Sequence, residues 1–247
     1  MILCIDAGNT RLKWGLWDAA AGGGHDGARW RAQGVCAHAD CVALASALPA
    51  GVDRMLACNV AGPEVATRIE ALAANLDVPL TWFRSSAACC GVTNAYDDPS
   101  RLGADRWAAL IGARGFHRGA ALVVMMGTAT TIDVLDASGR FRGGLILPGL
   151  ELMRRSLARN TAGLPEARGR YRELPTNTDD AIESGCLAAT LGAIERMAKA
   201  ACRPTSADFC VLLSGGGADA LAPHLDLPVR RIDNLVLEGL ARVAAGC

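Results

Sequence analysis

Short apolar runs, separated by turns and by stretches of helical periodicity, organise the first half of the chain. Residues 2–5 form one such run, and Leu12, Trp14 and Leu16 then alternate with charged or small residues. A β-branched run predicts a buried strand, and alternation predicts a strand with one buried face. The same reasoning predicts strands at 29–36, 54–60 and 80–83 and a helix at 63–75.

The pattern starts again near the middle of the chain. Strands are expected at 121–126, 130–135, 142–147 and 209–213, and helices at 149–158, 178–202 and 234–245. Each half therefore offers three strands followed by alternating helices and strands, the order of a ribonuclease-H-like lobe. A chain of 247 residues accommodates two such α/β lobes, which we expect at 1–115 and 116–247.

The turn after the first strand has the composition of a phosphate-binding turn. It reads Asp6-Ala7-Gly8-Asn9-Thr10. Gly8 allows a ligand to approach the backbone closely, and successive N–H groups in such a turn can hold an anion. Asp6 can hold a phosphate-bound Mg²⁺ through water, and Lys13 adds a positive charge. The alternative is an ordinary hairpin with a Gly-Asn turn.

A second turn of this kind follows the apolar run at 121–126. It reads Gly127-Thr128-Ala129-Thr130-Thr131-Ile132-Asp133, and Gly127 follows Gly8 by 119 residues, about half the chain. Two lobes that each offer such a turn are the layout of the actin, hexokinase and Hsp70 class of phosphotransferases. This analogy concerns the fold and defines no substrate.

Composition excludes several other classes of protein. The 25 basic residues balance the 25 acidic ones and aromatic residues make up 4%, so no nucleic-acid surface is expected. No cationic segment precedes the first apolar run, and no apolar stretch is long enough to span a bilayer, so we expect a cytoplasmic protein without a membrane partner. The ten dispersed cysteines are interpreted as reduced core residues, and their spacing predicts no zinc site.

A series of short strings along the chain resembles one family. The series comprises the first phosphate turn, Tyr96, Leu102-Gly103-Ala104-Asp105-Arg106-Trp107, the second phosphate turn, Gly143-Gly144-Leu145-Ile146-Leu147-Pro148-Gly149, Thr161-Ala162-Gly163-Leu164-Pro165, Asn177-Thr178 and Ser214-Gly215-Gly216-Gly217. Each string alone is weak. In this order and spacing they closely resemble type III pantothenate kinase.

The resemblance implies transfer of the ATP γ-phosphate to the primary hydroxyl of pantothenate, which gives 4′-phosphopantothenate for coenzyme A biosynthesis. Asp105 matches the family's general base, which accepts the proton of the hydroxyl as the phosphoryl group transfers. A residue at this place can instead merely cap the helix that follows. Arg106 can grip the carboxylate of pantothenate with two parallel hydrogen bonds, or form a surface ion pair.

The remaining site residues are also implied by the resemblance. ATP and its phosphates are expected to contact Asp6, Ala7, Gly8, Asn9, Thr10, Arg11, Leu12, Lys13 and Thr128. Pantothenate is expected to contact Tyr96, Gly103, Ala104, Asp105, Arg106 and Thr178. Mg²⁺ is expected at Asp6 through water, with Asp133 as a further candidate. Family members are homodimers whose pantothenate pocket takes residues from the second subunit, so a homodimer is expected.

One position departs from the family pattern. Many members have an Asp three residues before Thr128 that binds a monovalent cation, and this chain has Met125 there. A thioether is a poor ligand for a hard alkali cation, so the potassium site is in doubt.

Two other functions remain open from the sequence. One is another small-molecule kinase of the same superfamily, such as a sugar or acetate-type kinase. The other is a regulatory accessory protein, because some relatives of the family were first described as accessory factors for virulence-gene transcription. A test of substrates distinguishes the first, and an electrophoretic shift with DNA tests the second.

Overall fold

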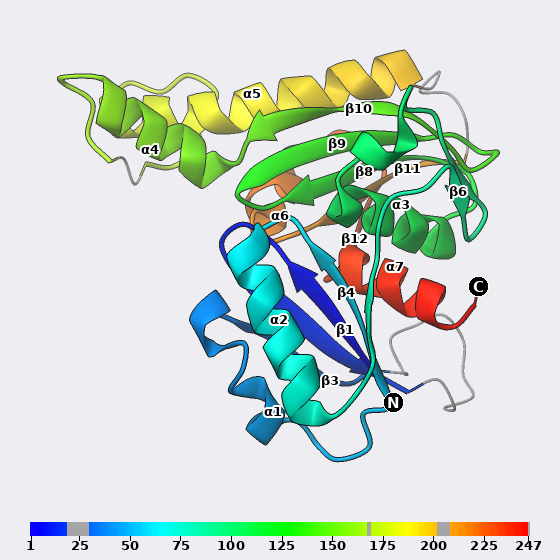
Figure 1. The fold of residues 1–247 in the computed structure, drawn as a ribbon. Helices are drawn as coiled ribbons and strands as arrows, with labels where there is room; N and C mark the ends of the chain where they lie inside the picture. The colour runs from blue at the N-terminus through cyan, green and yellow to red at the C-terminus, as the bar shows by residue number, and fades with distance from the viewer. Residues whose placement is uncertain (19–29, 167–168, 202–207, 247) are drawn as a thin grey trace. The chain divides into compact units, whose positions relative to one another are not determined.

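The computed structural model describes residues 1–18, 30–166, 169–201 and 208–246 (Figure 1). The chain divides into two compact units. Unit 1 comprises Met1–Arg118, Gly139–Phe141 and Asn234–Cys247, and unit 2 comprises Gly119–Ser138 and Arg142–Asp233. The expected division at residue 115 differs from these units chiefly at the C-terminal end, which returns to unit 1.

Unit 1 is built on a five-stranded sheet in the order β3-β2-β1-β4-β5. The strands are β1 (Ile2–Ala7), β2 (Leu12–Trp17), β3 (Trp30–Cys36), β4 (Arg54–Asn59) and β5 (Leu80–Trp82). β1, β2 and β3 pair antiparallel, whereas β4 is parallel to β1 and to β5. All five coincide closely with the strands expected from the apolar runs, although Arg29 lies outside the described residues.

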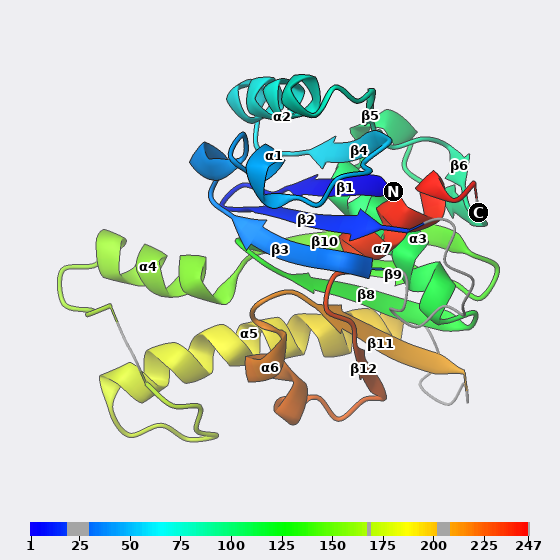
Figure 2. The ribbon, with the colours of Figure 1, turned by 90° about the horizontal axis from the view of Figure 1, so that it is seen from below.

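Alternation along β1 decides which side chains face which helices. Leu3 and Ile5 pack with Ile69 and Leu72 of α2 (Pro63–Leu76) in one buried cluster, and Figures 1 and 2 show α2 along that face of the sheet. Successive strand residues point to opposite faces. Asp6 therefore faces the other side of the sheet, where α7 (Leu235–Ala244) and α3 (Ala104–Phe116) pack.

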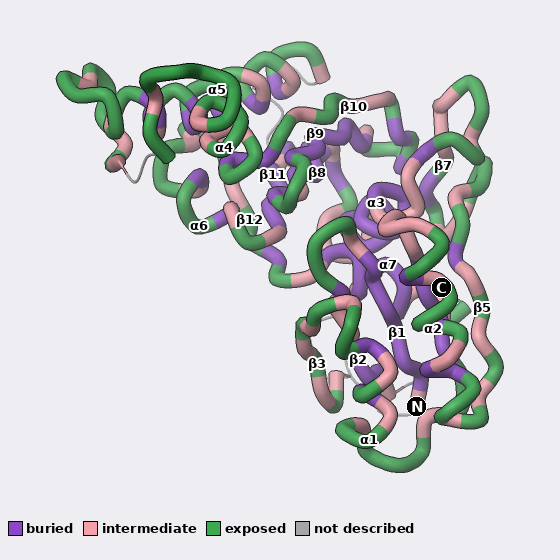
Figure 3. Tube along the Cα trace, turned by 60° about the vertical axis from the view of Figure 1, so that its left-hand side comes forward, coloured by how far each residue is buried: buried purple, intermediate pink, exposed green. Residues whose placement is uncertain are grey.

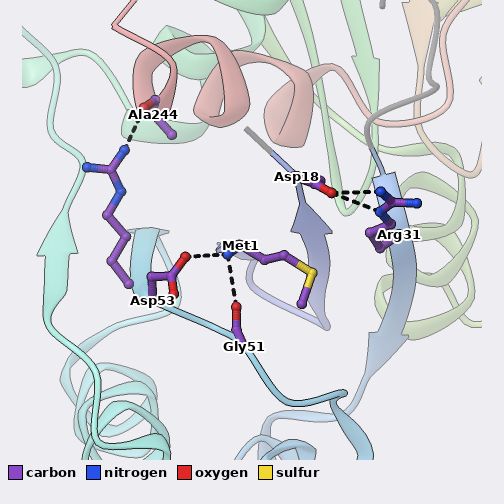
Figure 4. Close-up of polar contacts among 7 residues, drawn as sticks. Met1, Asp18, Arg31, Gly51, Asp53 and Ala244 are labelled. Atoms are coloured by element: carbon purple, nitrogen blue, oxygen red, sulfur yellow. Dashed lines mark hydrogen bonds and ion pairs between the residues drawn. The ribbon is translucent and has the colours of Figure 1, made fainter. Parts of the chain in front are cut away.

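Shorter elements complete unit 1. They are the 3-10 helices η1 (His38–Asp40) and η2 (Pro99–Arg101), the helix α1 (Leu44–Ala47) and the short strands β6 (Ala88–Cys89) and β7 (Val92–Asn94). Polar contacts fix the sheet at its ends: the terminal ammonium donates to the carbonyl of Gly51 and pairs with Asp53, and Arg31 pairs with Asp18 at 2.8 Å (Figure 4). Arg54 donates to the carbonyl of Ala244, the last residue of α7, at 2.7 Å.

Unit 2 is built on the strands β12, β11, β8, β9 and β10, in that order. Their bounds are β8 (Ala120–Met126), β9 (Ala129–Leu135), β10 (Arg140–Pro148), β11 (Phe209–Ser214) and β12 (Val229–Arg231). β8 is antiparallel to β9 and parallel to β11. The first two residues of β10 belong to unit 1, where they pair with β7.

The core of unit 2 lies between one face of this sheet and the long helix α5 (Thr178–Ala201). Leu122, Val124 and Met126 of β8 and Ile132 and Val134 of β9 share one buried cluster with α5. The helices α4 (Leu150–Asn160) and α6 (Ala218–Leu221) and the 3-10 helix η3 (Ala222–His224) complete the unit. Figure 3 shows α4 largely exposed, in contrast to the mostly buried strands β8 and β9.

The cysteines agree with the sequence interpretation at most described positions. Seven carry free thiols, and Cys4, Cys41, Cys58 and Cys186 among them are buried. The interpretation is wrong for Cys90, which is disulfide-bonded. Within the described part of the chain, no helix is both long and apolar enough to cross a membrane.

Candidate active site

Asp6 is a buried carboxylate at the end of β1, with a mixed set of neighbours. Only 4% of the residue is exposed. Its Oδ2 lies 3.8 Å from Nζ of Lys13, the residue directly opposite in β2. The thiol of Cys58, the residue beside it in β4, donates to Oδ1 at 3.6 Å. Lys13, expected from the sequence to add a positive charge at the phosphate turn, thus lies beside the Asp6 carboxylate.

The protonation of Asp6 is set by opposing effects. Burial raises the pKa of its carboxyl to about 6, because the charged form loses water. The positive charge of Lys13 lowers the pKa, and the negative charge of Asp105 raises it. Asp6 and Asp105 therefore lie within electrostatic reach of each other in unit 1, although 99 positions separate them in sequence.

The turn after β1 is exposed at Asn9 and Thr10, as a ligand-binding turn requires. A Cβ built on Gly8 would meet only the carbonyl oxygen of Arg11, at an ordinary 3.5 Å. Packing within the chain therefore does not explain the glycine. The carbonyl of Gly8 accepts a hydrogen bond from Nε2 of His38 at 2.8 Å. Sequence reasoning missed His38, because no spacing relates it to the turn.

Asp105 lies in the first turn of α3. Gly103 is the residue before the helix, so Asp105 is not the N-cap. Its Oδ1 nevertheless accepts the N–H of Arg106 at 2.8 Å. A Cβ on Gly103 would lie 2.7 Å from that same oxygen, so the glycine makes room for the carboxylate.

Arg106 packs beside two aromatic rings of unit 1. Only 5% of the residue is exposed. Its guanidinium donates to the hydroxyl of Tyr96 at 2.9 Å and lies 5.8 Å from the centre of the Tyr96 ring and 5.9 Å from that of Phe141. Charge–ring attraction and the hydrogen bond fix the orientation of the guanidinium. Phe141 is a second neighbour that the sequence did not indicate.

Tyr96 also borders a cavity within unit 1. The cavity has a volume of about 530 Å³, and its lining residues are Ala95, Tyr96, Asp97, Asp98 and Arg101. Unit 1 thus carries five of the expected residues on three segments of chain: Asp6 and Lys13 in the first hairpin, Tyr96 after β7, and Asp105 and Arg106 at the start of α3.

Three of the expected residues, Thr128, Asp133 and Thr178, belong to unit 2. Thr128 is exposed in the turn between β8 and β9. Asp133 in β9 is fully buried, and a Cβ on Gly144 of β10 would lie 2.1 Å from its Oδ1. Asp133 and Thr131 share the face of the sheet opposite the unit 2 core, because their neighbours Ile132 and Val134 point into that core.

Met125 stands on the same face as Thr131. The two residues are directly opposite in the β8–β9 pair, and Ser214 of β11 is the neighbour on the other side. These neighbours offer hydroxyl groups and no carboxylate. The hydroxyl of Thr131 is buried without a hydrogen-bond partner.

Thr178 is the exposed first residue of α5 and borders a large, mostly apolar cavity of unit 2. The cavity has a volume of about 870 Å³, and its walls include Met153 and Leu157 of α4, Leu164 and Ile182. A contact of Thr178 with a small ligand is therefore sterically possible. Among the described residues, no group of three or more His, Cys, Asp or Glu side chains is arranged to hold a metal ion.

Solved structures similar to this chain share its fold. A Baf-family transcriptional activator from Campylobacter jejuni aligns with a TM-score of 0.67 at 18% identity, over 99% of this chain and 98% of that one. A 2-dehydro-3-deoxygalactonokinase from Sinorhizobium meliloti aligns with a TM-score of 0.61 at 16% identity, over 100% and 98%. These likenesses bear out the expected two-lobe ribonuclease-H-like, actin-like α/β architecture, and they concern the fold alone.

Sequence comparison defines the family. The family model of type III pantothenate kinase matches residues 2–200. A type III pantothenate kinase from Aromatoleum aromaticum is 52% identical over 246 residues, which cover 99% of this chain and 98% of that protein. One from Dechloromonas aromatica is 49% identical over 250 residues, 99% of each. The chain belongs to the type III pantothenate kinase family.

Proposed function

We propose that this chain transfers the γ-phosphoryl group of ATP to the primary hydroxyl of pantothenate, the first step of coenzyme A biosynthesis. Family membership supports the activity. Within unit 1, the observation that favours it most is the electrostatic proximity of Asp6, beside the phosphate turn, and Asp105, at the start of α3. A kinase needs one carboxylate near the metal-bound phosphates and another near the attacking hydroxyl.

Asp105 is the proposed general base. A primary alcohol is a poor nucleophile at neutral pH, so a carboxylate within hydrogen-bond reach must accept its proton during transfer. The N–H of Arg106 donates to this carboxylate and holds it in place at the start of α3. Gly103 and Ala104 precede it and are proposed to contact the acceptor.

Arg106, Tyr96 and Thr178 are proposed to bind pantothenate. The aromatic neighbours of Arg106 orient its guanidinium before a carboxylate arrives, which lowers the entropy cost of binding. Tyr96 borders the cavity of about 530 Å³ in unit 1. Arg106 is almost fully buried. Contact with the ligand therefore requires that Tyr96, to which Arg106 donates, or the Arg106 side chain itself moves.

Residues 6–13 and Thr128 are proposed to bind ATP. The backbone of Gly8, which has no side chain, and the exposure of Asn9 and Thr10 suit a close phosphate. Asp6 offers carboxylate oxygens, which are the donors that Mg²⁺ prefers, and is proposed to hold this ion through water. When bound, Mg²⁺ neutralises charge on the β- and γ-phosphates. The role of Asp133 stays a prediction, and its full burial limits it to an indirect one.

A monovalent cation site does not fit the residues around Met125. Alkali cations need several oxygen donors, and a carboxylate helps to offset the cost of their dehydration. Thr131 and Ser214 supply hydroxyls only, and Ser214 already donates to the carbonyl of Asp233. We propose that the enzyme works without potassium.

Assembly as a homodimer is also proposed. Unit 2 exposes several large apolar side chains, which an interface with a second subunit would cover. They are Leu145, Ile146, Leu152, Leu157 and Leu174. The free thiols of most described cysteines support a reducing, cytoplasmic setting, with Cys90 as the exception.

The decisive experiment is a coupled assay of ADP release. Pantothenate is compared with glucose, acetate and glycerol at equal concentrations, with Mg²⁺ and ATP present. We expect ADP release with pantothenate and none with glucose, acetate or glycerol. Turnover with a sugar or with acetate, and none with pantothenate, would assign the chain to a different kinase activity.

A further inference from the structure

The phosphate turn is attached to the rest of unit 1 by a side chain that lies outside it. Nε2 of His38 lies 2.8 Å from the carbonyl oxygen of Gly8. His38 is half-buried and begins η1, which follows the edge strand β3. A carbonyl oxygen can only accept, so Nε2 of His38 is the protonated nitrogen in this contact.

This hydrogen bond determines which way the next N–H points. In a trans peptide unit, the C=O of one residue and the N–H of the next point in opposite directions. None of the described peptide bonds is cis. With the Gly8 carbonyl turned toward His38, the N–H of Asn9 points away from His38, and Asn9 itself is exposed.

Gly8 does not fix this orientation by itself. Glycine has wide conformational freedom because it lacks a Cβ, and a Cβ built on Gly8 would meet only the carbonyl oxygen of Arg11, at 3.5 Å. If the peptide unit between Gly8 and Asn9 flipped, a carbonyl oxygen would replace an N–H on the exposed side of the turn. That oxygen would repel a phosphate instead of binding it.

We propose that His38 is a positioning residue for the phosphate turn: by holding the Gly8 carbonyl, it keeps the Asn9 N–H available to an ATP phosphate. The proposal rests on the proposed function, because it takes residues 6–13 to bind ATP. It predicts that loss of the imidazole donor weakens binding of ATP and leaves binding of pantothenate almost unchanged.

Two substitutions distinguish the effect of the Nε2 hydrogen-bond donor from that of the imidazole ring as a whole. In His38→Gln, the amide nitrogen lies as many bonds from Cα as Nε2 does, so it can still donate to Gly8. In His38→Asn, the amide nitrogen is one bond closer to the backbone and cannot reach. Asp40→Asn is the matched control, because Asp40 is exposed on the same 3-10 helix.

The measurements are calorimetric binding of Mg-ATP without acceptor, the KM values for ATP and pantothenate, and the melting temperature. We expect His38→Asn to weaken Mg-ATP binding about five- to tenfold, as for one lost hydrogen bond, with the KM for pantothenate within about twofold of wild type. His38→Gln should recover most of the loss. Asp40→Asn should match the wild type.

Three results would overturn the proposal. Wild-type Mg-ATP affinity in His38→Asn would mean that the bond does not matter for the turn. Equal losses in Asn and Gln variants would mean that the ring, not its donor, is needed. Equal weakening of both ligands together with a lowered melting temperature would mark a structural role.

Failure of the proposed function has a different signature. If the wild type binds Mg-ATP but does not phosphorylate pantothenate, the activity is wrong, and the binding comparison of the His38 variants is unaffected. If the wild type does not bind Mg-ATP at all, the assignment of the turn to phosphate is wrong and the role of His38 is rejected with it.

Discussion

The burial of Asp6, the residue proposed to hold Mg²⁺, has a cost in stability. Burial at the end of β1 disfavours its charged form, and the ammonium of Lys13 at 3.8 Å offsets only part of that effect. A Mg²⁺ ion held through water would favour the charged form strongly. If Asp6 holds Mg²⁺ as proposed, its charged form is favoured more in the complex with Mg-ATP than in the free protein.

The stability of the free protein should reveal this cost. Because the folded-state pKa of Asp6, about 6, exceeds its ordinary value of 3.8, the native state binds the proton more tightly than the unfolded state does. Its contribution to stability is fully present below about pH 4 and is lost as the pH rises through about 6. Asp6→Asn should therefore gain stability relative to wild type over this window, by up to roughly 3 kcal/mol.

Urea unfolding at intervals between pH 4 and pH 7 measures this difference. Glu70→Gln is the control, because Glu70 is exposed on α2, and its difference from wild type should be flat. A flat difference for Asp6→Asn as well would mean that Lys13 keeps Asp6 ionised throughout the window.

Asp105 gives the corresponding prediction for catalysis. Asp105→Asn keeps the size of the side chain and an oxygen to accept the Arg106 N–H, but it gives up the proton acceptor. We expect a folded protein that binds Mg-ATP normally and whose kcat falls by ~10²–10⁴. Stopped assays of ADP release with calorimetry on ATP test both halves, and near-normal kcat would remove Asp105 from the mechanism.

At the scale of elements, the close packing of α7 against α3 holds in place the helix that carries the proposed base. A Cβ on Gly239 of α7 would lie 1.8 Å from the carbonyl oxygen of Ala108, and one on Gly112 of α3 would lie 2.3 Å from that of Leu235. The two helices thus approach backbone to backbone in unit 1. Because Asp105 and Arg106 begin α3, any displacement of this helix moves the proposed base.

Gly239→Ala should therefore be destabilising, although alanine is the better helix former. We expect a loss of about 1–3 kcal/mol in the free energy of unfolding, from forced separation of the helices, and a reduced kcat. Gly192→Ala is the matched control: Gly192 is also helical, and nothing lies within 4 Å of its added Cβ. That variant should gain about 0.5–1 kcal/mol. Equal effects of the two would contradict the close crossing.

Local pattern predicted the elements that extend over many residues. The apolar runs of β1, β4 and β8 and the spacing in α2 were read correctly, because each is long enough to show its period. β6, β7 and α6 have two to four residues and show none. The return of α7 to unit 1 could not be predicted either, because packing against a helix over a hundred residues away leaves no local signal.

The candidate site residues also fall into two groups, those that the sequence indicates and those that it does not. The strings around Asp6 and Asp105 were visible in sequence, since each combines a turn with a carboxylate. Cys58 and Phe141 reach the site only through sheet register and packing, and the parallel pairing of β1 with β4 sets the former. The backbone contact of His38 has no sequence signature at all.

For the molecule as a whole, the proposed homodimer leads to a complementation test. If each pantothenate pocket takes its base from one subunit and Thr178 from the other, an Asp105→Asn subunit paired with a Thr178→Trp subunit leaves one of the two pockets intact. Heterodimers should then recover up to about half of the wild-type activity, whereas each parent variant stays inactive. Verified heterodimers without recovery would mean that each pocket is self-contained.

The response to monovalent cations follows from the absence of a carboxylate at residue 125. An alkali ion and a neighbouring carboxylate offset each other's loss of water, so a chain with Met125 between Thr131 and Ser214 should not retain the ion. Replacing KCl by a bulky inert cation at constant ionic strength should leave kcat unchanged within about twofold.

Met125→Asp supplies the missing half of that test. The new carboxylate should either create activation by K⁺ or NH₄⁺ or, without an ion, destabilise unit 2, because an unpaired charge would be partly buried opposite the Thr131 hydroxyl. A melting temperature that rises with added K⁺ in the variant, but not in the wild type, would show that ion and carboxylate act together. Strong potassium activation of the wild type would contradict the argument. It would direct attention to Asp133, which shares this face of the sheet two residues beyond Thr131 and is the nearest carboxylate along that strand.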